Sequence, residues 1–133
     1  GELLRYRKRI GADNIAIFTD IKKKHSSHAI TADITVAETA KAAEFFLSNG
    51  VIVTGKSTAA AVDLQELKSV QSVVAIPVLV GSGITLENVA DYFDYCDGMI
   101  IGSCFKQEGI WSNNVDPGRV SAFMSLVSKL RSN

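Results

Sequence analysis

The sequence predicts an α/β fold, the carboxyl-terminal half of a (β/α)8 TIM barrel with four parallel βα units. Four short apolar runs alternate with helical stretches along the chain, a pattern typical of parallel strands joined by helical crossovers. The last two runs each end in small residues, Gly81-Ser82-Gly83 and Gly102-Ser103. Because a phosphate site shared by the last two strands recurs in such barrels, this doublet favours the half barrel over a flavodoxin-like open sheet, which remains the alternative.

Length and composition limit the possible functions. With 133 residues, 47% of them hydrophobic, we expect a single partial domain over 1–133, since a complete barrel needs about 250 residues. Lys plus Arg and Asp plus Glu both number 14, so we expect no nucleic-acid partner. We also expect a soluble protein without a transmembrane segment, since no apolar run nears the roughly 18 residues a spanning helix needs.

The cysteines and the first residue of the chain bear on the cellular compartment of the protein. Two cysteines without metal or disulfide spacing fit a reducing compartment, and we expect the cytoplasm. The chain opens on Gly1, so an amino-terminal half, with any targeting peptide, is expected to be missing.

The first helix is expected over 2–10, ending at Gly11. Its apolar stripe is Leu3, Tyr6 and Ile10, and its solvated face carries Arg5, Arg7, Lys8 and Arg9. The first strand is expected over 15–18, closing on Thr19-Asp20.

The second and third helices have clear start signals. Thr35 to Glu38 and Asp63 to Glu66 both match a capping box. The expected inward residues are Val36, Ala40, Ala43 and Leu47 in the second helix and Leu64, Leu67 and Val70 in the third. The strands that follow them are expected over 51–54 and 77–80.

The remaining helices and the fourth strand are predicted from the same kinds of signal. Thr85 is expected to cap a fourth helix with Leu86, Val89, Ala90 and Phe93 inward, and the fourth strand is expected over 99–101. A short extra helix is expected near 105–107. Asp116 and Pro117 then begin a final helix, whose inward residues are Val120, Phe123, Met124, Val127 and Leu130.

Glycine and serine at two neighbouring strand ends predict a phosphate-binding site. Backbone N–H groups of Gly81, Ser82, Gly83, Gly102 and Ser103 could approach an anion closely. Tight βα turns are the simpler interpretation, but they explain one glycine per strand end rather than two such ends with serine in both.

Three residues are candidate catalytic groups: Asp20, Lys22 and Lys56. A carboxylate near an ammonium at a strand end suits proton transfer next to a carbonyl or sugar hydroxyl, although Asp20 could instead cap a loop beside solvated lysines. His25 and His28 lack a third spaced ligand, so we expect no metal, and nothing indicates a cofactor.

Residues 50–57 match the Walker pattern G-x-x-x-x-G-K-S letter for letter. A nucleotide-binding loop needs its strand before the first glycine, whereas here the expected strand lies between the glycines. We therefore predict that the match is accidental.

Taken together, several segments resemble the BtpA family over essentially the whole chain. They are Asp20-Ile21-Lys22-Lys23-Lys24-His25, Thr35-Val36-Ala37-Glu38-Thr39-Ala40, Val53-Thr54-Gly55-Lys56-Ser57-Thr58 and Pro77-Val78-Leu79-Val80-Gly81-Ser82-Gly83, followed by Gly102-Ser103. The resemblance implies a ribulose-phosphate-binding type of barrel with phosphate at its last two strands. The family is named for photosystem I biogenesis, and many members from organisms without photosynthesis have no assigned reaction. A member would be roughly twice this length.

Two functions are compatible with these features. One is an enzyme that binds a phosphorylated, sugar-like small molecule, with isomerase or lyase chemistry. The other is a non-catalytic assembly or biogenesis factor. A half barrel also leaves two strand edges unpaired and exposes an inner face expected to carry Val53, Leu79 and Ile101 or their neighbours, so we expect a homo-oligomer or edge-paired dimer, or aggregation.

Overall fold

The computed structural model describes residues 2–21, 33–55 and 60–132. Four parallel strands form one sheet in the order β1-β2-β3-β4. The strands are β1 (Phe18–Asp20), β2 (Gly50–Val53), β3 (Val78–Val80) and β4 (Gly98–Met99). The helices are α1 (Glu2–Arg9), α2 (Val36–Phe45), α3 (Leu64–Gln71), α4 (Val89–Phe93) and α5 (Pro117–Leu130), and two 3-10 turns, η2 (Ser103–Phe105) and η3 (Gln107–Gly109), follow β4.

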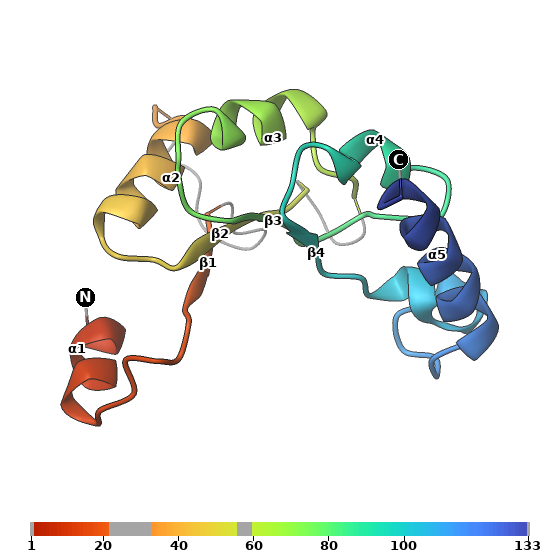
Figure 1. The fold of residues 1–133 in the computed structure, drawn as a ribbon, viewed down its shortest axis with the longest axis horizontal. Helices are drawn as coiled ribbons and strands as arrows, with labels where there is room; N and C mark the ends of the chain where they lie inside the picture. Colours follow the sequence, from red (N-terminus) through yellow and green to blue (C-terminus); the bar gives the residue numbers. More distant parts are fainter. Residues whose placement is uncertain (1, 22–32, 56–59, 133) are drawn as a thin grey trace.

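The helices lie along one side of the sheet. Figure 1 shows α2, α3 and α4 in an arc over that side, with α1 and α5 at the two ends of the arc. The predicted alternation of helices and parallel strands is therefore confirmed. Sequential strand order with helices on one side is the arrangement of a barrel wall, whereas a flavodoxin-like sheet reverses its strand order and carries helices on both faces.

The core lies between the sheet and α2 to α4. Alternate strand residues point into it, so Val51 and Val53 of β2 and Val78 and Val80 of β3 are buried. Val53 faces the core, and its neighbour Ile52 takes the place expected on the open side, because a strand turns every second side chain to the same face. Ile52 and Leu79, which are register partners, are half-buried on that opposite face.

The predicted helix starts are confirmed at three positions. Thr35 and Glu38 form a reciprocal capping box, with the Glu38 amide donating to Thr35 Oγ1 at 3.1 Å and the Thr35 amide to Glu38 Oε2 at 2.8 Å. Asp63 accepts from two amides at the start of α3. Asp116 does the same for α5, whose first residue is Pro117.

The fourth helix begins later than predicted. Asn88 accepts a hydrogen bond from the Thr85 amide at 2.8 Å and donates one to the Gly83 carbonyl at 2.9 Å. These bonds hold 83–88 as a turn, so α4 starts at Val89, and Leu86 is exposed rather than inward. The extra turn predicted near 105–107 is present as the two 3-10 turns.

Several further expectations are wrong. Ala90 of α4 and Met124 of α5, both expected inward, are exposed. The strand expected over 15–18 is β1, three residues later at its start. Leu47, expected inward from α2, lies beyond the end of that helix with a positive φ of 67° and is 70% exposed, because the chain has already turned away from the helix axis.

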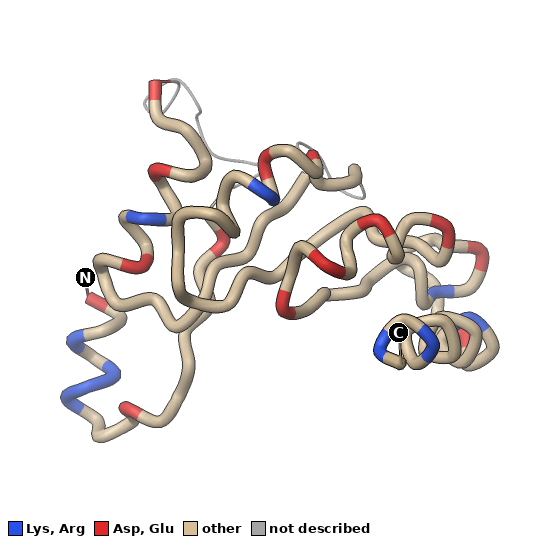
Figure 2. Tube along the Cα trace, turned by 45° about the horizontal axis from the view of Figure 1, so that its top comes forward, with Lys and Arg blue, Asp and Glu red and all other residues tan. Residues whose placement is uncertain are grey.

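Helix α1 buries none of its residues, so the expected apolar face of Leu3, Tyr6 and Ile10 is exposed. Figure 2 shows basic residues following one another along α1, with acidic residues gathered around α4. Arg7 was expected to be solvated, but its side chain makes hydrogen bonds within the protein. Its Nη1 donates to the Ile15 carbonyl at 2.8 Å and to Asn49 Oδ1 at 3.0 Å, which ties α1 to the chain on either side of β1.

No helix among the described residues has both the length and the apolar content needed to cross a bilayer.

Candidate functional site

The two glycine-ended strands leave the sheet side by side. Val80, the last residue of β3, is the register partner of Met99 in β4, and its carbonyl accepts from the Ile100 amide at 2.8 Å. The segments 81–83 and 102–103 therefore begin at the same edge of the sheet. The carboxyl edge of a parallel sheet is where ligands bind in α/β folds.

Ser82 joins the ends of β2 and β3. Its hydroxyl accepts from the Gly55 amide at 2.8 Å and donates to the Ala60 carbonyl at 3.0 Å, and the side chain is only 9% exposed. The hydroxyl of Ser82 is thus engaged within the protein, and this structural role was not predicted from the sequence.

Close packing accounts for two of the predicted glycines. A Cβ at Gly81 would lie 2.6 Å from Ile52 Cγ2 and 2.9 Å from Thr54 Cγ2. Gly83 has a φ of +70°, and a Cβ there would overlap the backbone of Ala60. Gly102 is different, because a Cβ at this position meets nothing within 4 Å. Of the glycines in the predicted cradle, Gly102 faces open space.

The other half of the edge is formed by the ends of β1 and β2. The Thr54 hydroxyl donates to Asp20 Oδ1 at 3.5 Å, a long hydrogen bond, with Thr54 buried and Asp20 half-buried. The structure therefore brings Asp20, Thr54 and Gly81 next to one another across three strand ends. Lys22 and Lys56, the predicted partners of Asp20, lie outside the described residues.

The described residues contain no cluster of three or more His, Cys, Asp or Glu side chains that could hold a metal ion. His25 and His28 lie outside them.

A groove of about 600 Å³ opens beside η2. It lies between the loop that leads into α4 and the start of α5, and the polar residues that line it include Thr85, Glu87, Ser103, Asp116 and Arg119. Arg119 Nε donates to the Cys104 carbonyl at 2.7 Å. Arg119 was not predicted as a site residue from the sequence, although its place in the first turn of a helix that follows the predicted phosphate segment was a usable signal.

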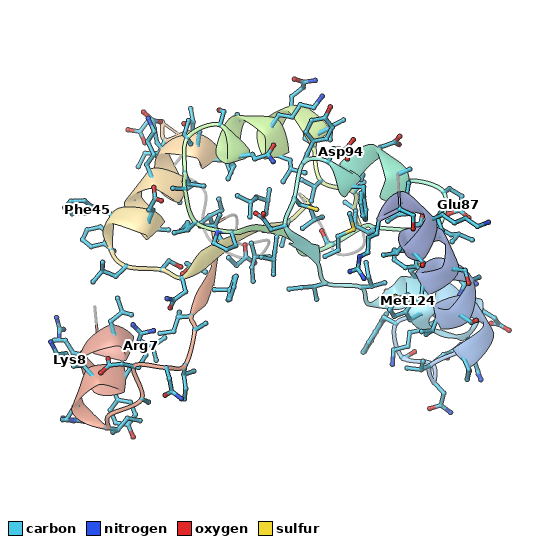
Figure 3. All side chains as sticks on the ribbon, in the orientation of Figure 1. Arg7, Lys8, Phe45, Glu87, Asp94 and Met124 are labelled. Carbon is cyan, nitrogen blue, oxygen red and sulfur yellow. The ribbon has the colours of Figure 1, made fainter. Side chains whose placement is uncertain are left out.

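Glu87 supplies a negative charge to this groove. Hydrogen bonds, first from the Thr85 side chain and then from the backbone, and to a smaller extent the Arg119 charge, hold the pKa of Glu87 below its ordinary value. Glu87 is labelled in Figure 3, on the segment that leads into α4. The groove is therefore lined by charges of both signs.

The Walker-like segment has the predicted structure of a strand. Strand β2 begins at Gly50 itself, and a Cβ at Gly50 would overlap the Phe18 ring and lie 2.9 Å from the Pro77 carbonyl oxygen. Gly50 is thus a packing glycine within the sheet, whereas the first glycine of a phosphate loop follows its strand. Lys56 and Ser57 lie outside the described residues.

Comparison with known proteins shows one consistent similarity. Residues 1–129 match the model of the BtpA family. An uncharacterized mitochondrial protein of Caenorhabditis elegans is 50% identical over 131 residues, which cover 98% of this chain and 47% of the relative. An uncharacterized protein of Methanocaldococcus jannaschii is 34% identical over 93% of this chain and 46% of its own length.

A third relative has a functional name. The photosystem I biogenesis protein BtpA of Synechocystis is 33% identical over 129 residues, 96% of this chain and 44% of that protein. The chain thus spans about half the length of the curated relatives it matches.

Proposed function

The chain belongs to the BtpA family, and from this premise we propose that it is half of a closed (β/α)8 barrel that binds a phosphorylated, sugar-like small molecule. The phosphate lies at the carboxyl ends of β3 and β4, against the backbone of 81–83 and of Gly102 and Ser103. The proposal includes isomerase or lyase chemistry at the opposite side of the same edge.

The observation that carries this proposal is the open space at Gly102, directly before the η2 turn. The first N–H groups of a helical turn have no partner within that turn and point along its axis toward an anion. The Phe105 amide is the first in η2 to donate a hydrogen bond within the turn, to the Gly102 carbonyl at 3.0 Å. An anion seated before η2 would meet no side chain from Gly102 itself.

Asp20 is the proposed proton-transfer group. It lies at the same edge as the phosphate segments, its register partner being Ile52 of the adjacent strand, and it accepts a hydrogen bond from Thr54. A half-buried carboxylate at a strand end can take a proton from a carbon next to a carbonyl. In the proposal Lys22 or Lys56 stabilises the resulting charge.

Calorimetric titration of the 133-residue chain with inorganic phosphate and ribose 5-phosphate tests the site. We expect binding of both by the wild type and loss of both in Gly102→Val, because the new side chain fills the space before η2. Since no atom lies within 4 Å of that Cβ, the variant should keep the fold, and circular dichroism checks this. Retained phosphate affinity in Gly102→Val would remove the site from consideration.

A non-catalytic assembly factor is the second candidate. It is favoured by a contiguous exposed apolar segment, Phe45, Phe46 and Leu47, with exposed fractions of 79, 66 and 70%. Figure 3 shows Phe45 projecting away from the body at the end of α2. Exposed aromatic clusters of this kind are typical of protein interfaces. The name of the Synechocystis relative agrees with such a role, and loss of partner capture in Phe45→Ser with unchanged phosphate affinity would support it.

Location and assembly complete the proposal. Both cysteines are free, which fits a reducing compartment, and we propose the cytoplasm. The alternative is the mitochondrion, which the name of the Caenorhabditis elegans relative mentions. We also propose that the unpaired edges of β1 and β4 pair with a second copy or with a complementary half barrel.

A further inference from the structure

We infer that Arg119 is the cation that holds the phosphate of this ligand, and that the groove beside η2 accepts a hydroxylated body together with it. The inference rests on the proposed function, because it names a residue and a substrate class for the same site. The groove is the space between the loop that leads into α4, the η2 turn and the start of α5.

Arg119 is fixed at both its backbone and its side chain. Its amide donates to Asp116 Oδ1 at 3.2 Å, and the Asp116 amide donates to the Phe105 carbonyl at 2.8 Å, which anchors the start of α5 on η2. Its Nε donates to the Cys104 carbonyl at 2.7 Å. A guanidinium that is already held loses less rotamer freedom when it binds an anion.

The remaining donors of Arg119 are available to a ligand. A guanidinium carries five N–H donors, and the bond to Cys104 uses the one on Nε. Within the described parts of the chain, neither Nη atom has a hydrogen-bond partner. They can pair with two phosphate oxygens at once, the geometry in which arginine binds phosphate most strongly. Of the predicted phosphate-binding residues, Ser103 lines the same groove, so the guanidinium and Ser103 face one space.

The carboxylates of the groove indicate what else the ligand carries. Asp116 is occupied in capping α5 through the Gly118 and Arg119 amides. Glu87 is exposed and ionised at neutral pH, since its pKa is lowered, and it has acceptor capacity beyond its bond with Thr85. A carboxylate repels bare phosphate but accepts hydrogen bonds from hydroxyl groups. The groove therefore suits a sugar or polyol phosphate better than inorganic phosphate.

Titration calorimetry of Arg119→Gln and Arg131→Gln at low ionic strength tests the inference. We expect Arg119→Gln to weaken both inorganic phosphate and ribose 5-phosphate about tenfold, the effect of losing one charge-assisted pair. Arg131, an exposed arginine at the other end of α5, is the matched control and should leave both affinities unchanged. An Arg119→Gln affinity within about twofold of wild type overturns the inference.

Glu87→Gln provides a second variant in case Arg119→Gln does not fold, which circular dichroism reveals. This substitution should raise the affinity for inorganic phosphate about twofold. It should also reduce the ratio of the affinity for ribose 5-phosphate to that for inorganic phosphate. Unchanged affinities for both probes overturn the inference. If Gly102→Val abolishes binding while Arg119→Gln does not, the proposed function stands and the role of Arg119 fails. If the wild type binds neither probe, both fail.

Discussion

Replacement of Ser82 by alanine tests whether this serine supports the fold or the ligand. Its hydroxyl links the Gly55 amide to the Ala60 carbonyl through two hydrogen bonds. Alanine removes both hydrogen bonds but keeps the backbone N–H of residue 82, which is the group proposed to approach an anion. We therefore expect a loss of stability without a loss of phosphate affinity.

The size of the loss follows from burial. Gly55 is buried, so its amide would lose its acceptor without gaining water, at a cost of about 1–2 kcal/mol. Ala60 is half-buried, so its carbonyl can be hydrated again, and the second bond contributes about 0.5–1 kcal/mol. The free energy of unfolding should fall by about 1.5–3 kcal/mol, which for a chain of this size lowers the melting temperature by about 6–12 °C.

Thermal and urea unfolding followed by circular dichroism measures this change. Ser125→Ala, at an exposed position within α5, is the control and should stay within about 0.5 kcal/mol of wild type. Equal stability of the two variants would refute the bridging role of Ser82. A Ser82→Ala variant that folds but no longer binds phosphate would show that the hydroxyl itself contacts the ligand.

Four further predictions concern other parts of the chain. Lys56→Ala should leave any MgATP affinity unchanged in titration calorimetry, and a Lys56-dependent affinity would contradict the assignment of β2. The amide and then the hydroxyl of Thr35 lower the pKa of Glu38, so this carboxylate stabilises the fold above its ordinary pKa and ceases to do so as the pH falls through the lowered value. The melting temperature of Glu38→Gln should therefore fall less than that of wild type between about pH 5 and about pH 3, and parallel curves would argue against the capping box. Burial raises the pKa of Cys96, so in Cys104→Ser the alkylation rate should reach half its maximum at a higher pH than for free cysteine; the same midpoint would place Cys96 in solvent. Light scattering should give a dimer or larger species, whereas a compact monomer would favour a self-contained open sheet over a half barrel.

Features set by a few adjacent residues could be predicted from the sequence. The caps at Thr35, Asp63 and Asp116 depend on a side chain and an amide two or three residues away, and the βα alternation follows from local apolar patterns. These local interactions do not depend on contacts with distant parts of the chain.

Features set by contacts between distant segments could not be predicted. The open face carries Ile52 rather than Val53, because a shift of one residue moves a side chain to the other face of a strand. The Ser82 hydroxyl is engaged by Gly55 and Ala60, which precede it by more than twenty residues. Arg119 faces the groove only because α5 folds back onto η2.

The sequential strand order also determines how this chain folds. Each described strand bonds only with strands next to it in the sequence, and α2 packs on α3 as α4 packs on α5. Contacts between successive units require only short loop closures, which favours fast folding, and stability then spreads along the chain as it does in repeat proteins. The β2 and β3 pair, with neighbours on both sides, should be the last part to open. Helix α1, which buries no residue, should exchange its amide hydrogens first.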